Sequence, residues 1–149
     1  LGLAILLSYS RPPLDISGLG IAVIIAHTML AIPFVIRAVR PAISQLDGRL
    51  PESARSLGAP PRAVLWEIML PLIRGSLVVG AVFAFAISIA EMSATIMIVG
   101  QDSATMPLSV FLLSDRSNYG APSAMSAIMI VVLGLSFYIM DRFGRIDFA

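Results

Sequence analysis

Three long stretches of this sequence carry no charged side chain, and they limit what the chain can fold into more than any other feature. They cover residues 19–36, 75–90 and 120–140. An apolar helix of about 20 residues, rising 1.5 Å per residue, matches the roughly 30 Å hydrocarbon core of a bilayer. A chain of 149 residues is too short to bury three such helices on all sides in a soluble core. The sequence therefore predicts an integral membrane protein, an all-α polytopic bundle of transmembrane helices.

We expect one membrane domain over residues 1–149, and its first residues already resemble the second half of an apolar helix. The domain would then be the C-terminal part of a longer protein. The third expected span is longer than one perpendicular crossing requires, so it must tilt, break or project from the membrane. A half-length apolar segment, MPLSVFLL, predicts a short surface or re-entrant helix before the last span. The expected spans are about 1–8 (partial), 17–39, 72–99 and 121–140, with a polar segment at 40–71.

The placement of arginine predicts the orientation of the chain. Only Arg11 and Arg116 lie on one face of the expected bundle. The other eight flank the polar segment or follow the last span: Arg37, Arg40, Arg49, Arg55, Arg62, Arg74, Arg142 and Arg145. Because cytoplasmic loops of membrane proteins carry the excess of basic side chains, we expect the polar segment and the C-terminus in the cytoplasm. The expected location is the inner or plasma membrane of the cell.

Within the polar segment, the stretch PESARSLGAPPRAVLWEIMLP has the residue types of a stiff helical corner. Pro51 suits a first helical turn, and Glu52 favours the positive end of the helix dipole. Gly58 stands where helices most often end in a left-handed residue. Pro61 can begin a second helix, which would reach the membrane at Pro71. These features alone allow two interpretations: a loop that rests on the membrane surface, or a grip for a soluble partner.

Side-chain spacing divides the first of these two helices into faces. Leu50, Ala54 and Leu57 are separated by four and three positions, which places them on one apolar stripe. Arg55 and Ser56 lie elsewhere on the helix. We therefore expect the stripe to face apolar surface and the polar side chains to be available to water or to a partner.

Six positions of this corner carry a family signature. They follow the pattern Glu-x-Ala, three residues, Gly, nine residues, Ile-x-Leu-Pro, in which Ser53 replaces a second alanine. The chain thereby resembles the membrane subunits of binding-protein-dependent ABC importers, of the type I permease class. The stretches IAHTMLAIPFVIRAVRPAISQLD, ISIAEMSATIMIVG, TMPLSVFLL and YGAPSAMS resemble the same family. The signature positions are Glu52, Ala54, Gly58, Ile68, Leu70 and Pro71, with Ser53 between the first two.

This resemblance implies that the corner is a coupling helix docking on a cytoplasmic ABC ATPase subunit. It also implies an extracytoplasmic solute-binding protein and a second permease subunit or half as partners, in the lipid bilayer and without nucleic acid. The chain has no glycine-rich phosphate loop and no lysine, so we expect ATP and Mg on the ATPase subunit and no cofactor on this chain. The expectation is therefore a transport subunit and not an enzyme.

Glu91 stands out within the third span, because a carboxylate in a bilayer is costly and normally faces a bundle interior or water. Two interpretations stay open. In the first, Glu91, Ser93 and Thr95 line the substrate pathway; in the second, Glu91 is a structural hydrogen-bonding residue. His27 is the single histidine, and with Glu91 it makes too few ligands for a metal site, so we expect a helix-packing hydrogen bond there.

An importer permease is thus the leading interpretation of the sequence. The alternative from another class is a non-transporting membrane scaffold that recruits a soluble partner through the same helices. An intramembrane hydrolase is disfavoured, because no nucleophile motif surrounds any serine. By resemblance, the expected substrate is ferric iron or a thiamine-like small solute, and next molybdate, tungstate or sulfate. No arginine lies in the uncharged part of a span, since Arg37 and Arg74 stand close to span ends, and this disfavours an oxyanion held by side-chain charge.

Overall fold

Helices make up every regular element that the structure, a computed structural model, describes. The described residues are 2–9, 20–98, 104–114 and 119–144, and no strand occurs among them. An all-α fold is thereby confirmed. The helices are α1 (Gly2–Tyr9), α2 (Gly20–Gln45), α3 (Arg49–Ser56), α4 (Pro61–Ala63), α5 (Leu70–Ala90), α6 (Ser93–Ile98), α7 (Met106–Ser114) and α8 (Gly120–Phe143), with a π-helical segment (Val64–Met69) between α4 and α5.

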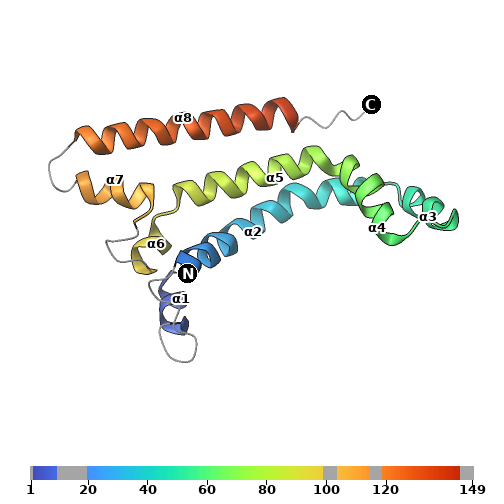
Figure 1. The fold of residues 1–149 in the computed structure, drawn as a ribbon, viewed down its shortest axis with the longest axis horizontal. Helices are drawn as coiled ribbons and strands as arrows, with labels where there is room; N and C mark the ends of the chain where they lie inside the picture. The colour runs from blue at the N-terminus through green and yellow to red at the C-terminus, as the bar shows by residue number, and fades with distance from the viewer. Residues whose placement is uncertain (1, 10–19, 99–103, 115–118, 145–149) are drawn as a thin grey trace.

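Within the described residues, three helices are long and apolar enough to cross a membrane: Ile21–Gln45, Pro61–Ala90 and Gly120–Phe143. They run alongside one another as α2, α5 and α8, with α3 and α4 at one end of the layer and α1, α6 and α7 at the other (Figure 1). We call these ends the corner end and the opposite end. The middle helix has 30 residues, about 45 Å at 1.5 Å per residue, and so exceeds the hydrocarbon core.

The expected spans lie on these helices with different ends. The segment expected at 17–39 lies on α2, which continues through Pro33 and Pro41 to Gln45; residues 17–19 are outside the described part. The segment expected at 72–99 begins earlier in the structure, at Pro61, and its helix ends at Ala90. A break follows at Glu91–Met92, and α6 resumes the chain at Ser93.

Small residues let α2 and α5 pack closely along their length. Ser76 and Gly80 of α5 are buried, and a Cβ atom added at Gly80 would lie 3.4 Å from Val35 Cγ1 and 3.5 Å from Val39 Cγ2. Membrane helices associate through such close backbone approach, because lipid supplies no hydrophobic force between them. The α2–α5 pair is therefore the frame on which the rest of the chain is arranged.

A small buried cluster holds the opposite end together. Ala22 and Ala26 of α2 pack there against Ala94 and Ile98 of α6. Helix α8 packs on α5 and α7, yet none of its most apolar window is buried inside the chain. The outward side of α8 is thus apolar surface suited to lipid or to another membrane subunit.

Candidate functional site

The corner (residues 49–71) turns at the end of α3. Helix α3 ends at Ser56 with Leu57 as its C-cap, and Gly58 follows with a φ of +87°. The Gly58 N–H donates to the Arg55 carbonyl at 2.9 Å, and the Ala59 N–H donates to the Ala54 carbonyl at 3.0 Å. This pair of bonds is the Schellman motif, which ends a helix with a left-handed residue. The left-handed glycine predicted from the sequence is confirmed.

The start of α3 is fixed by polar groups. The Asp47 carboxylate accepts a hydrogen bond of 3.0 Å from the Arg49 N–H. Pro51 and Glu52 both fall within the first turn, where a missing N–H and a negative charge are best tolerated. Glu52 and Ser53 are exposed, so their side chains are accessible to a partner.

The expectation that the stripe of Leu50, Ala54 and Leu57 faces apolar surface is wrong for Leu57. Leu57 is 89% exposed, the highest value among the large apolar side chains that are exposed in the described chain. Ala54, the middle of that stripe, is half-buried. Leu50, at the other end of the stripe, is 49% exposed, and α3 has no buried residue. The stripe is therefore left uncovered by the described chain.

The second arm of the corner is continuous with a membrane helix. Pro61 begins it, the π-helical segment Val64–Met69 widens it by one residue per turn, and α5 follows without interruption. The Leu70 N–H bonds to the Leu65 carbonyl, five residues back, directly before Pro71. A π-turn at this point accommodates a proline that cannot donate to a carbonyl four residues earlier. Ile68 and Leu70 are half-buried, and Pro71 is exposed.

This geometry makes the corner a rigid, accessible projection. Helix α3 packs on the π-helical segment, whose Val64 is 1% exposed. A Cβ atom added at Gly58 would meet nothing within 4 Å, so the turn is open on its outer side. Both long helices, α2 and α5, lead into it (Figure 1). A body bound to the corner could therefore push or pull both helices together.

The three residues proposed for a substrate pathway lie around the break after α5, in two different settings. Both carboxylate oxygens of Glu91 accept the Ala94 N–H at 3.0 Å, so Glu91 caps the start of α6. Glu91 and Ser93 also line a pocket of about 400 Å³ with Leu30. Thr95 is fully buried and faces away from this group, toward α2.

His27 connects three helices at this end of the molecule. Its Nδ1 lies 2.8 Å from Ser88 Oγ on α5, and its Nε2 lies 3.1 Å from Thr95 Oγ1 on α6. The helix-packing hydrogen bond predicted for His27 is confirmed. Ser88 was not singled out from the sequence, because its partner is 61 positions away. Across the described residues, no group of three His, Cys, Asp or Glu side chains could hold a metal ion.

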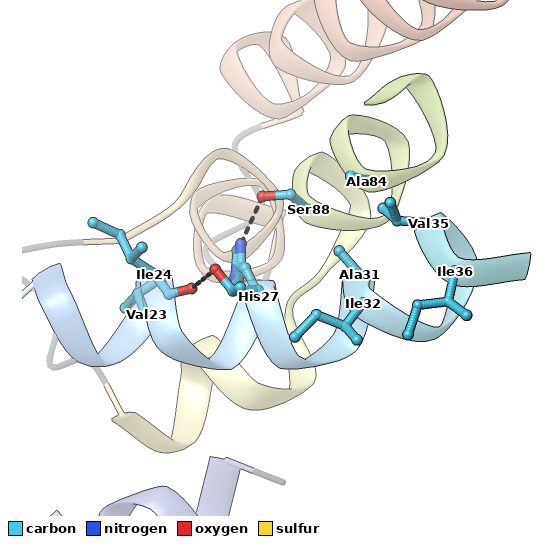
Figure 2. Close-up of a pocket in the computed structure, with 10 residues that line it drawn as sticks. Val23, Ile24, His27, Ala31, Ile32, Val35, Ile36, Ala84 and Ser88 are labelled. Carbon is cyan, nitrogen blue, oxygen red and sulfur yellow. Dashed lines mark hydrogen bonds between the residues drawn. The ribbon is translucent and has the colours of Figure 1, made fainter. Parts of the chain in front are cut away.

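A pocket of about 460 Å³ lies beside His27, between α2 and α5. Figure 2 shows its walls, which are mostly aliphatic, with the His27–Ser88 bond at one end. Thr28, also part of the lining, donates a bond of 2.7 Å to the Ile24 carbonyl of its own helix. The pocket lies within the two longest membrane-crossing segments and offers few polar groups to a charged solute.

Comparison with known proteins gives a match along almost the whole chain. A family model described as the binding-protein-dependent transport system inner membrane component matches residues 3–143. The matched range contains the corner, all three long helices and the residues around the α5–α6 break.

Individual relatives are transport permeases. A protein named as a 2-aminoethylphosphonate transport system permease, PhnV of Salmonella paratyphi A, is 28% identical over 144 residues, which are 97% of this chain and 54% of the relative. The ferric transport system permease FbpB of Actinobacillus pleuropneumoniae is 29% identical over 132 residues, 89% of this chain and 19% of the relative. The sulfate transport system permease CysT of Escherichia coli K12 is 32% identical over 134 residues, 85% of this chain and 48% of the relative. The chain thus spans about half the length of PhnV and of CysT.

Proposed function

The chain belongs to the family of binding-protein-dependent transport system inner membrane components, and from this premise we propose that it is the membrane-spanning permease subunit of an ATP-driven ABC importer. Membership confirms the resemblance drawn from the six signature positions. The proposal is that this subunit forms part of the translocation pathway for a small solute and hydrolyses nothing itself.

The observation that carries the proposal is the corner. Its exposed side chains, Glu52 and Ser53, stand beside a glycine turn that is open on its outer side. Its second arm continues without a break into α5. A loop that only rested on a membrane would need neither the locked turn nor the continuous arm. We therefore assign residues 51–71 to docking on a cytoplasmic ABC ATPase subunit.

Coupling then follows from a two-state bundle. ATP and Mg bind the ATPase subunits, whose closure moves the docked corners. Because α2 and α5 pack along their length, they transmit this movement to the opposite end of the membrane. A loaded extracytoplasmic binding protein biases the same equilibrium from the other side, since each partner prefers one state. The apolar outward side of α8 supports a second permease subunit or half as a neighbour.

The substrate proposal is a small solute delivered by that binding protein. Ferric iron or a thiamine-like solute is the first choice, and molybdate, tungstate or sulfate the next. One relative is named for ferric transport, the first choice, and another for sulfate transport, which belongs to the next. A third relative, named for 2-aminoethylphosphonate, adds that compound to the solutes to be tested.

The test is reconstitution of the intact protein in liposomes with a candidate ATPase subunit and a candidate binding protein from the same organism. ATP-dependent uptake of the solute that the binding protein retains is the expected result. Stable capture of the ATPase with no uptake of any solute tested would favour a membrane scaffold instead. Failure to capture the ATPase would refute the assignment of the corner.

A further inference from the structure

Helices α5 and α6 are joined by a two-residue link at the end of the bundle opposite the corner. Helix α5 stops at Ala90, and Glu91 takes an extended conformation with ψ of 123°. The Glu91 N–H reaches the Ser88 carbonyl at 3.4 Å, a long bond. Two residues, Glu91 and Met92, therefore join the helices without helical hydrogen bonds across the break. Such a link alone would let α6 swing relative to α5.

His27 spans this break from outside. It bonds Ser88, three positions before Glu91, and Thr95, four positions after it. A neutral imidazole donates through one nitrogen and accepts through the other, and a hydroxyl group can take either complementary role. One side chain of α2 thus holds both sides of the break at once. We call these three residues the His27 bridge.

The two hydroxyl groups of the bridge are used differently from other hydroxyl groups in the helices. Thr28, Ser114 and Ser136 each donate to the carbonyl four residues earlier in their own helix. Such local bonds are the usual choice of a helical serine or threonine. Ser88 and Thr95 bond across helices instead. Because Thr95 is 0% exposed, no solvent can replace its partner.

Packing alone does not join α5 to α6. Helix α6 rests mainly on α1 and α2, through Ala94 and Ile98 among others. On the α5 side, Ala84 and Ser88 border the 460 Å³ pocket. The C-terminal part of α5 is therefore less tightly packed on α2 than the part around Gly80. The His27–Ser88 bond lies at one end of this pocket (Figure 2).

From this arrangement we propose that His27 is a positioning residue that makes α2, α5 and α6 move as one unit at the end opposite the corner. The proposal rests on the proposed function: movement that enters through α5 reaches α6 through the bridge and not through the two-residue link. Loss of the bridge would leave docking on the ATPase intact and weaken the transfer of movement to α6. Uptake would then become uncoupled from ATP hydrolysis.

The first measurement is of geometry and needs no transport. The chain has no cysteine, so spin labels can be placed at Phe85→Cys on α5 and Met97→Cys on α6, which are 44% and 51% exposed. His27→Leu should broaden the distance distribution between these labels. The matched control is Thr28→Val, which removes a neighbouring hydroxyl bonded only within its own helix. Equal distributions in both variants and in the unmodified protein would overturn the positioning role.

The second measurement is the amount of solute moved per ATP hydrolysed. Ser88→Ala and Thr95→Val each remove one of the two hydrogen bonds of the His27 bridge. Each should lower this ratio about threefold, the size expected from the loss of a single interhelical hydrogen bond in a membrane. Their double variant should equal His27→Leu, and His27→Gln, whose amide both donates and accepts, should recover most of the coupling. ATPase capture should stay unchanged. A normal ratio in both single variants would overturn the proposal. If the unmodified protein moves no solute but His27→Leu still broadens the distances, the proposed function fails and the positioning role stands.

Discussion

Gly58 offers a test that separates two reasons for a glycine at the corner. Its φ of +87° is a conformation that side chains with a Cβ rarely adopt. A Cβ atom there would meet nothing within 4 Å in the chain itself. Any cost inside this subunit is therefore one of backbone conformation alone. A second cost arises only if an ATPase subunit approaches the turn closely.

The two costs order the variants differently. An L-residue in the left-handed conformation costs about 1–2 kcal/mol. Gly58→Ala should therefore destabilise the corner by about 1 kcal/mol, which lowers the population of the intact corner about fivefold. Gly58→Val, with its branched Cβ, should destabilise the corner by about 2 kcal/mol, which lowers the population of the intact corner about thirtyfold. Gly58→Asn should lose least, since asparagine is enriched in this conformation. If close approach of a partner dominates, Gly58→Asn must instead be worse than Gly58→Ala, because its side chain is larger.

The assay is capture of the ATPase subunit by the intact permease in detergent, followed by ATP-dependent uptake in liposomes. We expect Gly58→Val to lower both the most, by up to about thirtyfold. If Gly58→Asn retains more capture and uptake than Gly58→Ala, backbone conformation is the cause. If Gly58→Ala retains more than Gly58→Asn, close approach of the ATPase subunit is the cause. Normal capture and uptake in Gly58→Val would refute the reasoning about the corner altogether, provided that expression and solubility match the unmodified protein.

Three further predictions concern the rest of the fold. Gly80→Ala places a methyl group at 3.4 Å from Val35, an ordinary contact, and should leave thermal stability in detergent unchanged or raised. Gly80→Leu should instead lower stability by about 1–3 kcal/mol through overpacking. Equal melting temperatures of the two variants would contradict the close α2–α5 crossing. Glu91→Ala should remove the α6 cap and lower the free energy of unfolding by about 0.5–2 kcal/mol, while Glu91→Gln keeps an acceptor for the Ala94 N–H. If Glu91→Gln melts normally but blocks uptake, a role in the pathway is favoured over a purely structural one. Leu57→Cys in this cysteine-free chain should react with a membrane-impermeant maleimide only after the cytoplasmic side is opened, and labelling of intact spheroplasts would reverse the orientation.

Residue types at short range predicted the corner well. Gly58 and the prolines around it act through their own backbone limits, which do not depend on the rest of the fold. The structure accordingly shows the left-handed turn at the expected residue. Leu57 shows where such short-range reasoning fails. Helical spacing predicts a stripe facing apolar surface, but Leu50 is 49% and Leu57 89% exposed, because spacing gives the face of a helix and not what covers that face.

The opposite end was less predictable. A third span too long for one crossing indicated a tilt, a break or a projection, and the sequence did not choose among them. The structure combines an extension back to Pro61 with a break at Glu91–Met92. Glu91 and Thr95 stand close in sequence, yet one caps a helix beside a pocket and the other turns to His27.

The sequence by itself determined that the chain is a membrane protein, that it is helical, and that it carries the signature of an importer permease. The first two properties depend on transfer of side chains from water to lipid and on local backbone preferences, both of which are set by residue type within a few positions. The third rests on resemblance to a known family. Only the tertiary structure decided that His27 joins Ser88 and Thr95, which are 61 and 68 positions away. Such bonds form only where packed helices bring their side chains into register: α2 packs on α5 at Gly80, and on α6 through Ala22, Ala26, Ala94 and Ile98.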